Sequence, residues 1–305
     1  MTSTLAVRAE DLRVTFGETR ALDGLDLQIH PGQIHAILGP NGAGKTTFIR
    51  VVTTLQAPTS GRAEVLGIDV TAHPEQVRSQ IGVAGQYATV DEYLSGRENL
   101  LLTGTLYGLS PSERKARTAD LLERFELTDA ADRVAKTYSG GMRRRLDLAA
   151  ALMGNPRVLF LDEPTTGLDV RTRGVLWEEV RQTAARGVSI VLTTQYLEEA
   201  DALADQVSII DHGRLVAGGT PAELKAAVGE EILVLVPEDG ALLTAMCTAV
   251  GGEIYQDAIR VRTARDGVTS TLMRAAQVGA LAQVNTSTAS LDDVFLAYTG
   301  HGTQE

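Results

Sequence analysis

A glycine-rich turn near the N-terminus has the residue types and spacing that bind a polyphosphate. Gly39-Pro-Asn-Gly-Ala-Gly-Lys-Thr46 fits the pattern G-x-x-x-x-G-K-[ST], between an apolar run at residues 33–38 and a helix-compatible stretch. Glycines let the backbone bend around phosphates with its amides pointing inward. Lys45 can then reach the β- and γ-phosphates, where it also assists catalysis, and the Thr46 hydroxyl can ligate Mg²⁺. The residues expected to contact the nucleotide here are Gly39, Asn41, Gly42, Ala43, Gly44, Lys45, Thr46 and Thr47.

Two adjacent carboxylates follow a second apolar run. Residues 157–161 are typical of a central strand in a parallel sheet, and the run ends in Asp162 and Glu163. Open α/β sheets bind ligands at the carboxyl ends of their strands. Asp162 is therefore the candidate to hold Mg²⁺, and Glu163 is the candidate general base that orients water for in-line attack on the γ-phosphate. Without the strand and Lys45, the pair could equally be a solvated surface feature.

Between these segments lies Tyr138-Ser-Gly-Gly-Met142, which opens another helix-compatible stretch. Two glycine amides, a serine hydroxyl and the N-terminus of the following helix together form an element that can bind an anion. The simpler interpretation is a glycine-rich helix cap without a ligand.

Ser139-Gly-Gly-Met142 and Leu161-Asp-Glu-Pro-Thr-Thr-Gly-Leu-Asp169 resemble the signature, the magnesium-site strand and the D-loop of ATP-binding cassette (ABC) ATPases over about residues 5–225. The resemblance implies an α/β fold, the P-loop NTPase cassette, with a central mostly parallel sheet, an antiparallel β subdomain and a helical insert at about residues 88–137. It also implies ATP and Mg²⁺ as cofactors, and a head-to-tail dimer with a second copy of the chain. In that dimer, Ser139, Gly140 and Gly141 of one copy would contact the γ-phosphate bound by the other.

Further site residues follow from the same resemblance, one position at a time. Phe16 matches the aromatic residue that stacks on adenine, for which only the ring face is needed. Gln86 matches the Q-loop glutamine, which touches Mg²⁺ and the attacking water, and Asp169 matches the D-loop aspartate. Without these neighbours, Phe16 would be an ordinary core aromatic and Gln86 an ordinary loop residue. Met142 replaces the glutamine that is more usual in the signature.

The main departure from the family follows the apolar run at residues 188–194. Most members place there a histidine that contacts the γ-phosphate, whereas this chain has Gln195. A glutamine can donate a hydrogen bond to phosphate but cannot become cationic near neutral pH, so catalysis would rely on Glu163. The Thr-Thr-Gln-Tyr-Leu pattern here and the terminal Ser290-Leu-Asp-Asp-Val-Phe resemble the daunorubicin-resistance type of ABC drug-exporter ATPase, a likeness that spans nearly the whole chain.

Composition narrows the class of protein. The chain has 305 residues, one cysteine and a formal net charge of −11. A single cysteine excludes an internal disulfide framework, and no run of about eighteen apolar residues is present to span a membrane. The charge argues against an extended nucleic-acid-binding face, and the triplet Arg143-Arg-Arg145 is expected to divide between solvent and local ion pairs. We expect a peripheral protein on the cytoplasmic side of the cell membrane, which meets the membrane only through a partner.

Two domains are predicted: a nucleotide-binding domain at residues 1–228 and an α+β domain at residues 229–305 with a regulatory or dimerisation role. Capping signals predict helices beginning after Ser95, Ser110 and Thr220, the last being the final helix of the first domain. In the second domain, apolar patterns predict strands near residues 231–236, 254–256 and 259–262, helices near 240–249 and 268–278, and an amphipathic segment at 291–298.

The resulting hypothesis is the ATP-hydrolysing subunit of an ABC transporter, which powers export of drugs or antibiotics through a separate transmembrane permease. The alternative is a non-transport ABC ATPase, a switch in translation or DNA repair. Repair members insert long coiled coils, yet only 117 residues without sustained heptads separate Lys45 from Asp162, and translation members typically carry two cassettes. A third alternative, a GTPase or kinase of the phosphate-loop class, would not explain the signature, and the chain lacks the Asn-Lys-x-Asp guanine motif.

Overall fold

The computed structural model describes residues 4–85, 90–228, 230–264, 267–288 and 290–300. The chain divides into two compact units, Met1–Gly218 and Gly219–Glu305. Gln86 lies outside the described residues, so the structure does not bear on its predicted role. Within the described ranges, no helix has the length and apolar character needed to span a bilayer.

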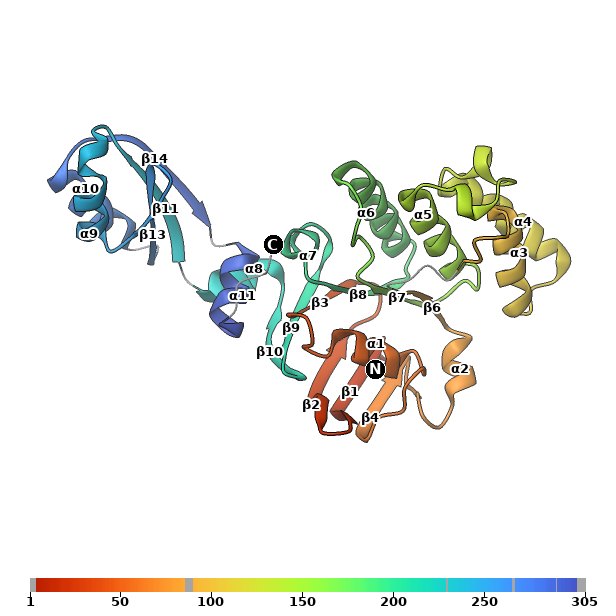
Figure 1. The fold of residues 1–305 in the computed structure, drawn as a ribbon. Helices are drawn as coiled ribbons and strands as arrows, with labels where there is room; N and C mark the ends of the chain where they lie inside the picture. The colour runs from red at the N-terminus through yellow and green to blue at the C-terminus, as the bar shows by residue number, and fades with distance from the viewer. Residues whose placement is uncertain (1–3, 86–89, 229, 265–266, 289, 301–305) are drawn as a thin grey trace. The chain divides into compact units, whose positions relative to one another are not determined.

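A mostly parallel sheet forms the centre of the first unit, with strand order β10-β9-β3-β8-β7-β6 in the described residues. β9, β3, β8, β7 and β6 pair in parallel. Every residue of β3, β7 and β8 is buried, because helices cover both faces, as the continuous apolar runs predict. Figure 1 shows α5 and α6 on one face and α1 on the other. The strands are β3 (Ile34–Leu38), β6 (Ile81–Ala84), β7 (Val158–Asp162), β8 (Ser189–Thr194), β9 (Gln206–Asp211) and β10 (Arg214–Gly219); the helices are α1 (Lys45–Val52), α5 (Gly140–Ala151), α6 (Val170–Ala185) and α7 (Leu197–Leu203).

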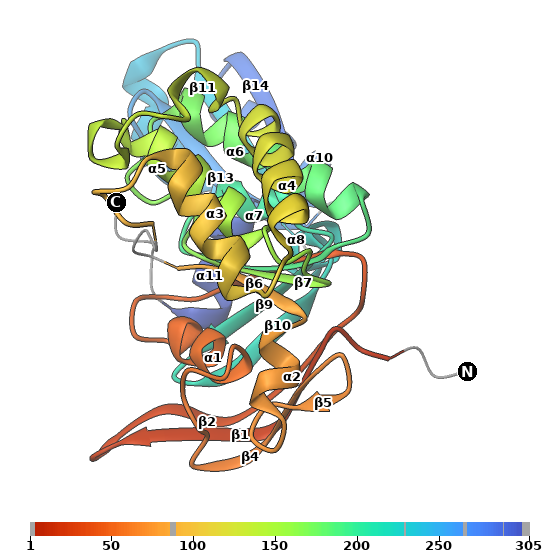
Figure 2. The same ribbon diagram turned by 90° about the vertical axis from the view of Figure 1, so that its right-hand side faces the viewer.

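A second, antiparallel sheet covers the outer side of α1, as Figure 2 shows. Its strands are β1 (Val7–Phe16), β2 (Thr19–Ile29), β4 (Ser60–Val65) and β5 (Ile68–Asp69). Phe48, Val51 and Val52 of α1 are completely buried, in one core with apolar residues of both sheets. The helix that follows the phosphate loop is therefore held on two sides. The predicted combination of a parallel sheet with an antiparallel β subdomain is confirmed.

Two helices in the region predicted as a helical insert begin at the predicted residues. α3 (Gly96–Leu106) and α4 (Pro111–Arg124) each start with a complete capping box, formed by Ser95 with Glu98 and by Ser110 with Glu113. Shorter elements complete the first unit: α2 (Pro74–Arg78) and the 3-10 turns η1 (Thr128–Ala130) and η2 (Ala135–Thr137).

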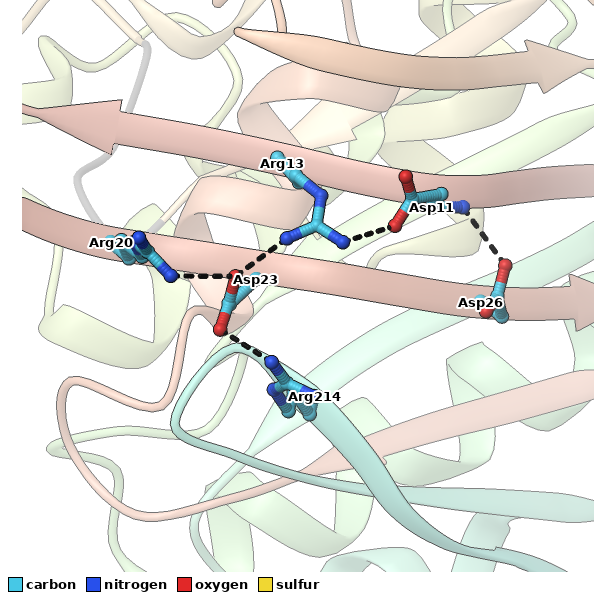
Figure 3. A network of polar contacts seen from close by, with 6 residues as sticks. All are labelled: Asp11, Arg13, Arg20, Asp23, Asp26 and Arg214. Carbon is cyan, nitrogen blue, oxygen red and sulfur yellow. Dashed lines mark hydrogen bonds and ion pairs between the residues drawn. The ribbon is translucent and has the colours of Figure 1, made fainter.

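Hydrogen bonds between Asp23 and surrounding arginines connect the antiparallel sheet to the central sheet (Figure 3). Asp23 on β2 accepts hydrogen bonds from Arg13 of β1 at 2.8 Å and from Arg214 of β10 at 2.7 Å, and Arg20 approaches to 3.6 Å. The hydrogen bond from Arg214 lowers the pKa of Asp23, which the charges of Arg20 and Arg13 assist while burial opposes the shift. The Asp23 amide also donates to the Gly213 carbonyl, and the Gly213 amide donates to the carbonyl of Ala43 in the phosphate loop. The turn before β10 thus joins β2 to the phosphate loop.

The second unit has an antiparallel sheet, in the order β12-β13-β11-β14, and its own apolar core. Two differences from the sequence prediction arise from weak local signals. β14 was not predicted, because its sequence is largely polar and it pairs at the edge with β11. α8, expected to end the first domain, packs against α11, so the unit begins at Gly219 and the expected boundary after residue 228 falls inside it. The elements are α8 (Pro221–Val228), β11 (Glu230–Pro237), η3 (Gly240–Leu242), α9 (Leu243–Val250), β12 (Glu253–Tyr255), β13 (Ala258–Ala264), α10 (Val268–Val278), β14 (Leu281–Thr288) and α11 (Leu291–Thr299).

A buried histidine in β3 is expected to make the free energy of unfolding depend on pH. His35 is 4% exposed, its Nε2 lies 2.9 Å from Ser208 Oγ, and burial lowers its pKa from 6.5 to about 4, with a smaller effect of His30. Between these pH values the unfolded chain binds a proton that the folded chain does not. The free energy of unfolding should therefore be at its full value above pH 6.5 and fall by about 3 kcal/mol as pH decreases to about 4.

Urea unfolding at a series of pH values checks this expectation. His35→Gln should flatten the profile over that range, whereas His73→Gln, at an exposed histidine, should keep the wild-type slope. An unchanged slope in the His35 variant would contradict the assignment.

Candidate functional site

Three of the predicted segments follow the carboxyl ends of adjacent strands of the parallel sheet. The phosphate loop follows β3, Asp162 and Glu163 end β7, and Gln195 follows β8, which lies between those two strands. Leu38 is in register with Thr194, and Asp162 with Thr193. The hydroxyl of Thr46, in the first turn of α1, donates a hydrogen bond to Asp162 Oδ1 at 3.3 Å. The two predicted magnesium ligands in the described residues thus lie side by side.

Lys45 is held inside the phosphate loop. Its side chain is 5% exposed, and its ammonium donates to the carbonyl oxygens of Gly39 at 2.7 Å and Pro40 at 3.1 Å. Burial lowers the pKa of Lys45, and the charges of Glu163 and Asp162 oppose that shift. The cation is therefore weakly hydrated and close to both carboxylates, a setting in which an anion interacts with it strongly.

Glycine is required at the start of α1. Gly44 has φ +107°, and a Cβ there would lie 2.5 Å from the Ala21 carbonyl oxygen and 2.8 Å from a Leu22 methyl group. No side chain caps this helix among the described residues. Its N-terminal amides therefore remain available to an anionic ligand.

The carboxylate pair is fixed by a residue that the sequence analysis did not select. Thr193 of β8 donates its hydroxyl proton to Asp162 Oδ1 and accepts the backbone amide of Glu163 at 3.1 Å. Glu163 itself has φ +49°, a left-handed conformation that is rare and strained for a residue with a side chain. The backbone that carries the candidate base is thus held in one unusual conformation. The available sequence signal was a pair of threonines at the end of an otherwise apolar strand.

The signature segment packs against the start of α6, directly after the D-loop residue Asp169. Ser139 caps α5 by accepting the Met142 amide at 3.2 Å, and both Ser139 and Gly140 are exposed. A Cβ on Gly141 would lie 2.5 Å from the Thr172 methyl group, and Thr172 in turn donates to Asp169, the cap of α6. Within the described residues no hydrogen bond joins the signature to the phosphate loop. The signature is therefore exposed, and Thr172 links it to Asp169.

The two remaining predicted site residues, Phe16 and Gln195, are both at least partly exposed. Phe16 ends β1 and is 48% exposed, so its side chain is accessible to a ligand. Gln195 is half-buried directly after β8. Arg144, part of the triplet expected to divide between solvent and local ion pairs, forms such an ion pair with Asp147 and also donates to the Pro164 and Gly85 carbonyls, two contacts that the sequence analysis did not predict.

Comparison with known proteins agrees with this geometry. A sequence profile of the family described as ABC transporter matches residues 22–166. A daunorubicin resistance ATP-binding protein of Streptomyces coeruleorubidus is 47% identical, over 98% of this chain and 96% of that protein. A daunorubicin/doxorubicin resistance ATP-binding protein of Streptomyces peucetius is 46% identical, over 98% and 93%. A solved structure described as the ATP-binding subunit of an ABC transporter superposes with a TM-score of 0.67 at 29% identity, over 74% of this chain and 94% of that one.

Fold, site and similarity over both units point to one family. The phosphate loop, the carboxylate strand and the signature all lie within residues 22–166, which the family profile matches. The chain therefore belongs to the ABC transporter family, and within it to the daunorubicin/doxorubicin-resistance type of ATP-binding protein, with ATP as its nucleotide and ATP hydrolysis as its reaction.

Proposed function

We propose that this ATPase powers the export of a drug or antibiotic through a separate transmembrane permease, at the cytoplasmic side of the cell membrane. The observation that supports this most is the identity to drug-resistance ATP-binding proteins, which extends over 98% of the chain and so includes the second unit. The substrate path would belong to the permease, because the motor acts on nucleotide alone.

Mg²⁺ would be held by the Thr46 hydroxyl and the Asp162 carboxylate, with Gln86 as a further ligand. The fit rests on chemistry: these are oxygen donors, which Mg²⁺ prefers, and the first two lie 3.3 Å apart. Bound Mg²⁺ would neutralise charge on the β- and γ-phosphates. Thr193 would keep Asp162 oriented toward Thr46.

Lys45 would exchange partners when ATP binds. In the structure its ammonium is satisfied by the carbonyls of Gly39 and Pro40. A phosphate oxygen carries a full charge and makes a stronger hydrogen bond than a carbonyl, so polyphosphate would draw the ammonium toward itself. Phe16 would stack on the adenine at the other end of the nucleotide.

Glu163 would act as the general base toward the attacking water. Its strained backbone conformation and the hydrogen bond from its backbone amide to the Thr193 hydroxyl fix the position of the backbone that carries the side chain. Less reorganisation of the carboxylate is then needed when water attacks. Gln195, on the adjacent strand, would donate a hydrogen bond to the γ-phosphate.

A second copy of the chain would complete each site. Ser139 and Gly140 are exposed and Gly141 has its own contact with Thr172, so the signature presents a hydroxyl and free amides outward. The N-terminus of α5 adds favourable potential for a phosphate. We assign these three residues, with Asp169, to the ATP bound by the partner copy. The second unit would support this dimer or regulate its coupling to the permease.

Gln195 gives a prediction specific to this chain. Gln195→Ala should slow ATP hydrolysis about ten- to a hundredfold, because one or two hydrogen bonds to a charged group are lost. Gln195→His should stay active and acquire a pH dependence near 6 to 7, roughly the range of imidazole. Steady-state rates of the three proteins across pH 5.5 to 9, as a rough working range, measure both effects. An alanine variant as fast as wild type would mean that Gln195 does not touch the γ-phosphate.

Transport itself is tested by co-expressing the chain with a candidate transmembrane permease. Co-expression of the pair should lower the intracellular level of a fluorescent anthracycline, and Lys45→Ala should remove that effect. A chain ending at Gly218 should bind ATP but transport less, if the second unit has the proposed role. An ATPase that nucleic acid stimulates and no permease affects would favour a non-transport switch instead.

A further inference from the structure

A largely buried arginine connects three segments of the ATP site. Arg144 lies in the first turns of α5, the helix that Ser139 caps, and its side chain is 11% exposed. Its Nε donates to the Pro164 carbonyl at 2.7 Å, and its Nη1 donates to the Gly85 carbonyl at 2.6 Å and to Asp147 Oδ2 at 3.0 Å. Asp147 is completely buried one turn further along the helix.

The two carbonyls belong to the residues beside two predicted catalytic groups. Pro164 directly follows Glu163, and Gly85 directly precedes Gln86 in the chain. One planar guanidinium therefore spans the loop after β7 and the end of β6. A lysine has a single nitrogen and could not hold both carbonyls in this fixed geometry.

Stability alone is a poor reason for this arrangement. A buried ion pair loses hydration that its mutual attraction often fails to recover, so apolar residues of similar volume would serve a purely structural core as well. What an apolar residue cannot do is to bond two backbone carbonyls at once. The neighbour Arg145 shows the contrast, because it bonds the Phe125 carbonyl at 3.0 Å and Glu126 at 3.1 Å, away from both loops.

We propose that Arg144 is a positioning residue, which locks the loop after Glu163 and the end of β6 at Gly85 to the helix that carries the signature. The inference rests on the proposed function, in which the signature serves the ATP of the partner copy. A movement of α5 when the signature meets that ATP is then passed through Arg144 to the general base of its own site. The two ATP sites of the dimer are thereby coupled through one side chain on each copy.

Arg144→Gln in the full-length chain tests the proposal, with Arg145→Gln as the matched control on the same helix. Arg144→Gln should lower kcat about ten- to a hundredfold and leave KM for ATP within about twofold, since the phosphate loop keeps its contacts while the base is displaced. The Hill coefficient for ATP should also fall toward one. Arg145→Gln should match wild type within about twofold.

A second variant separates positioning from simple charge balance. If Arg144 only balanced the charge of buried Asp147, the pair Arg144→Gln with Asp147→Asn would remove the excess buried charge and restore both melting temperature and kcat. Under the proposal the double variant regains melting temperature but not kcat. Recovery of kcat in the double variant, or a wild-type kcat in Arg144→Gln, would overturn it.

A readout without turnover keeps the test independent of the proposed function. Hydrogen exchange of the amides at residues 165–168, measured without nucleotide, should rise about threefold or more in Arg144→Gln and in the double variant, but not in Arg145→Gln. A wild-type chain that hydrolyses no ATP would refute the proposed function. Unchanged exchange in these residues would refute the role of Arg144 whatever the activity.

Discussion

Glu163→Gln should abolish ATP turnover, by about a thousandfold, while ATP remains bound. Glutamine keeps the size of the side chain and the backbone bond from the residue 163 amide to Thr193, but it cannot accept a proton from water. The phosphate loop and its contacts are untouched, so the affinity for ATP should stay within about twofold. With hydrolysis blocked, ATP should remain between two copies and hold them together as a stable dimer.

Light scattering with and without ATP, together with release of phosphate, measures both parts of this expectation. Glu178→Gln is the matched control, because Glu178 is exposed on α6, where it accepts a hydrogen bond from Gln182 and approaches Arg181 of the same helix. This control should hydrolyse ATP like wild type and dimerise only transiently. A Glu163 variant that binds ATP yet stays monomeric would rule out the shared site, although Glu163 could still be the base.

Lys45→Ala should abolish ATP binding at concentrations that saturate wild type, a loss of about a hundredfold or more in affinity. The loss corresponds to about 2.7 kcal/mol, which is within the range for hydrogen bonds to a charged group in a partly dehydrated site. Because the ammonium is only 5% exposed and bonds two loop carbonyls, its removal also leaves the empty loop less ordered before ATP arrives.

Calorimetric titration with ATP compares this variant with Lys115→Ala, which removes a lysine from the surface helix α4. The control should bind like wild type. Melting temperatures of both variants separate lost contacts from lost folding, since a folded Lys45 variant should melt within a few degrees of wild type. Full ATP affinity in that variant would show that the Lys45 ammonium of the wild type stays bonded to the Gly39 and Pro40 carbonyls and does not contact the phosphates.

Much of the site could be predicted from the sequence because its elements are encoded locally. The phosphate loop needs glycines and Lys45 within eight consecutive residues, and helix starts such as Ser95 with Glu98 depend on hydrogen bonds only three residues apart. Continuous apolar runs identified β3, β7 and β8 as buried strands. Since parallel strands present their carboxyl ends at one edge, the meeting of Thr46 with Asp162 also followed.

Only the tertiary structure decided the contacts that cross between distant segments. Arg144 and Arg145 are adjacent and chemically identical, yet one is bonded to Gly85 and Pro164 and the other to the helical segment at Phe125. Asp23 meets Arg214 from 191 positions away. The strain at Glu163 and its bond to Thr193 depend on the register between β7 and β8. Local sequence sets which hydrogen bonds a segment can make with itself, whereas burial and strand register, which the whole chain determines, select the partners of its remaining polar groups.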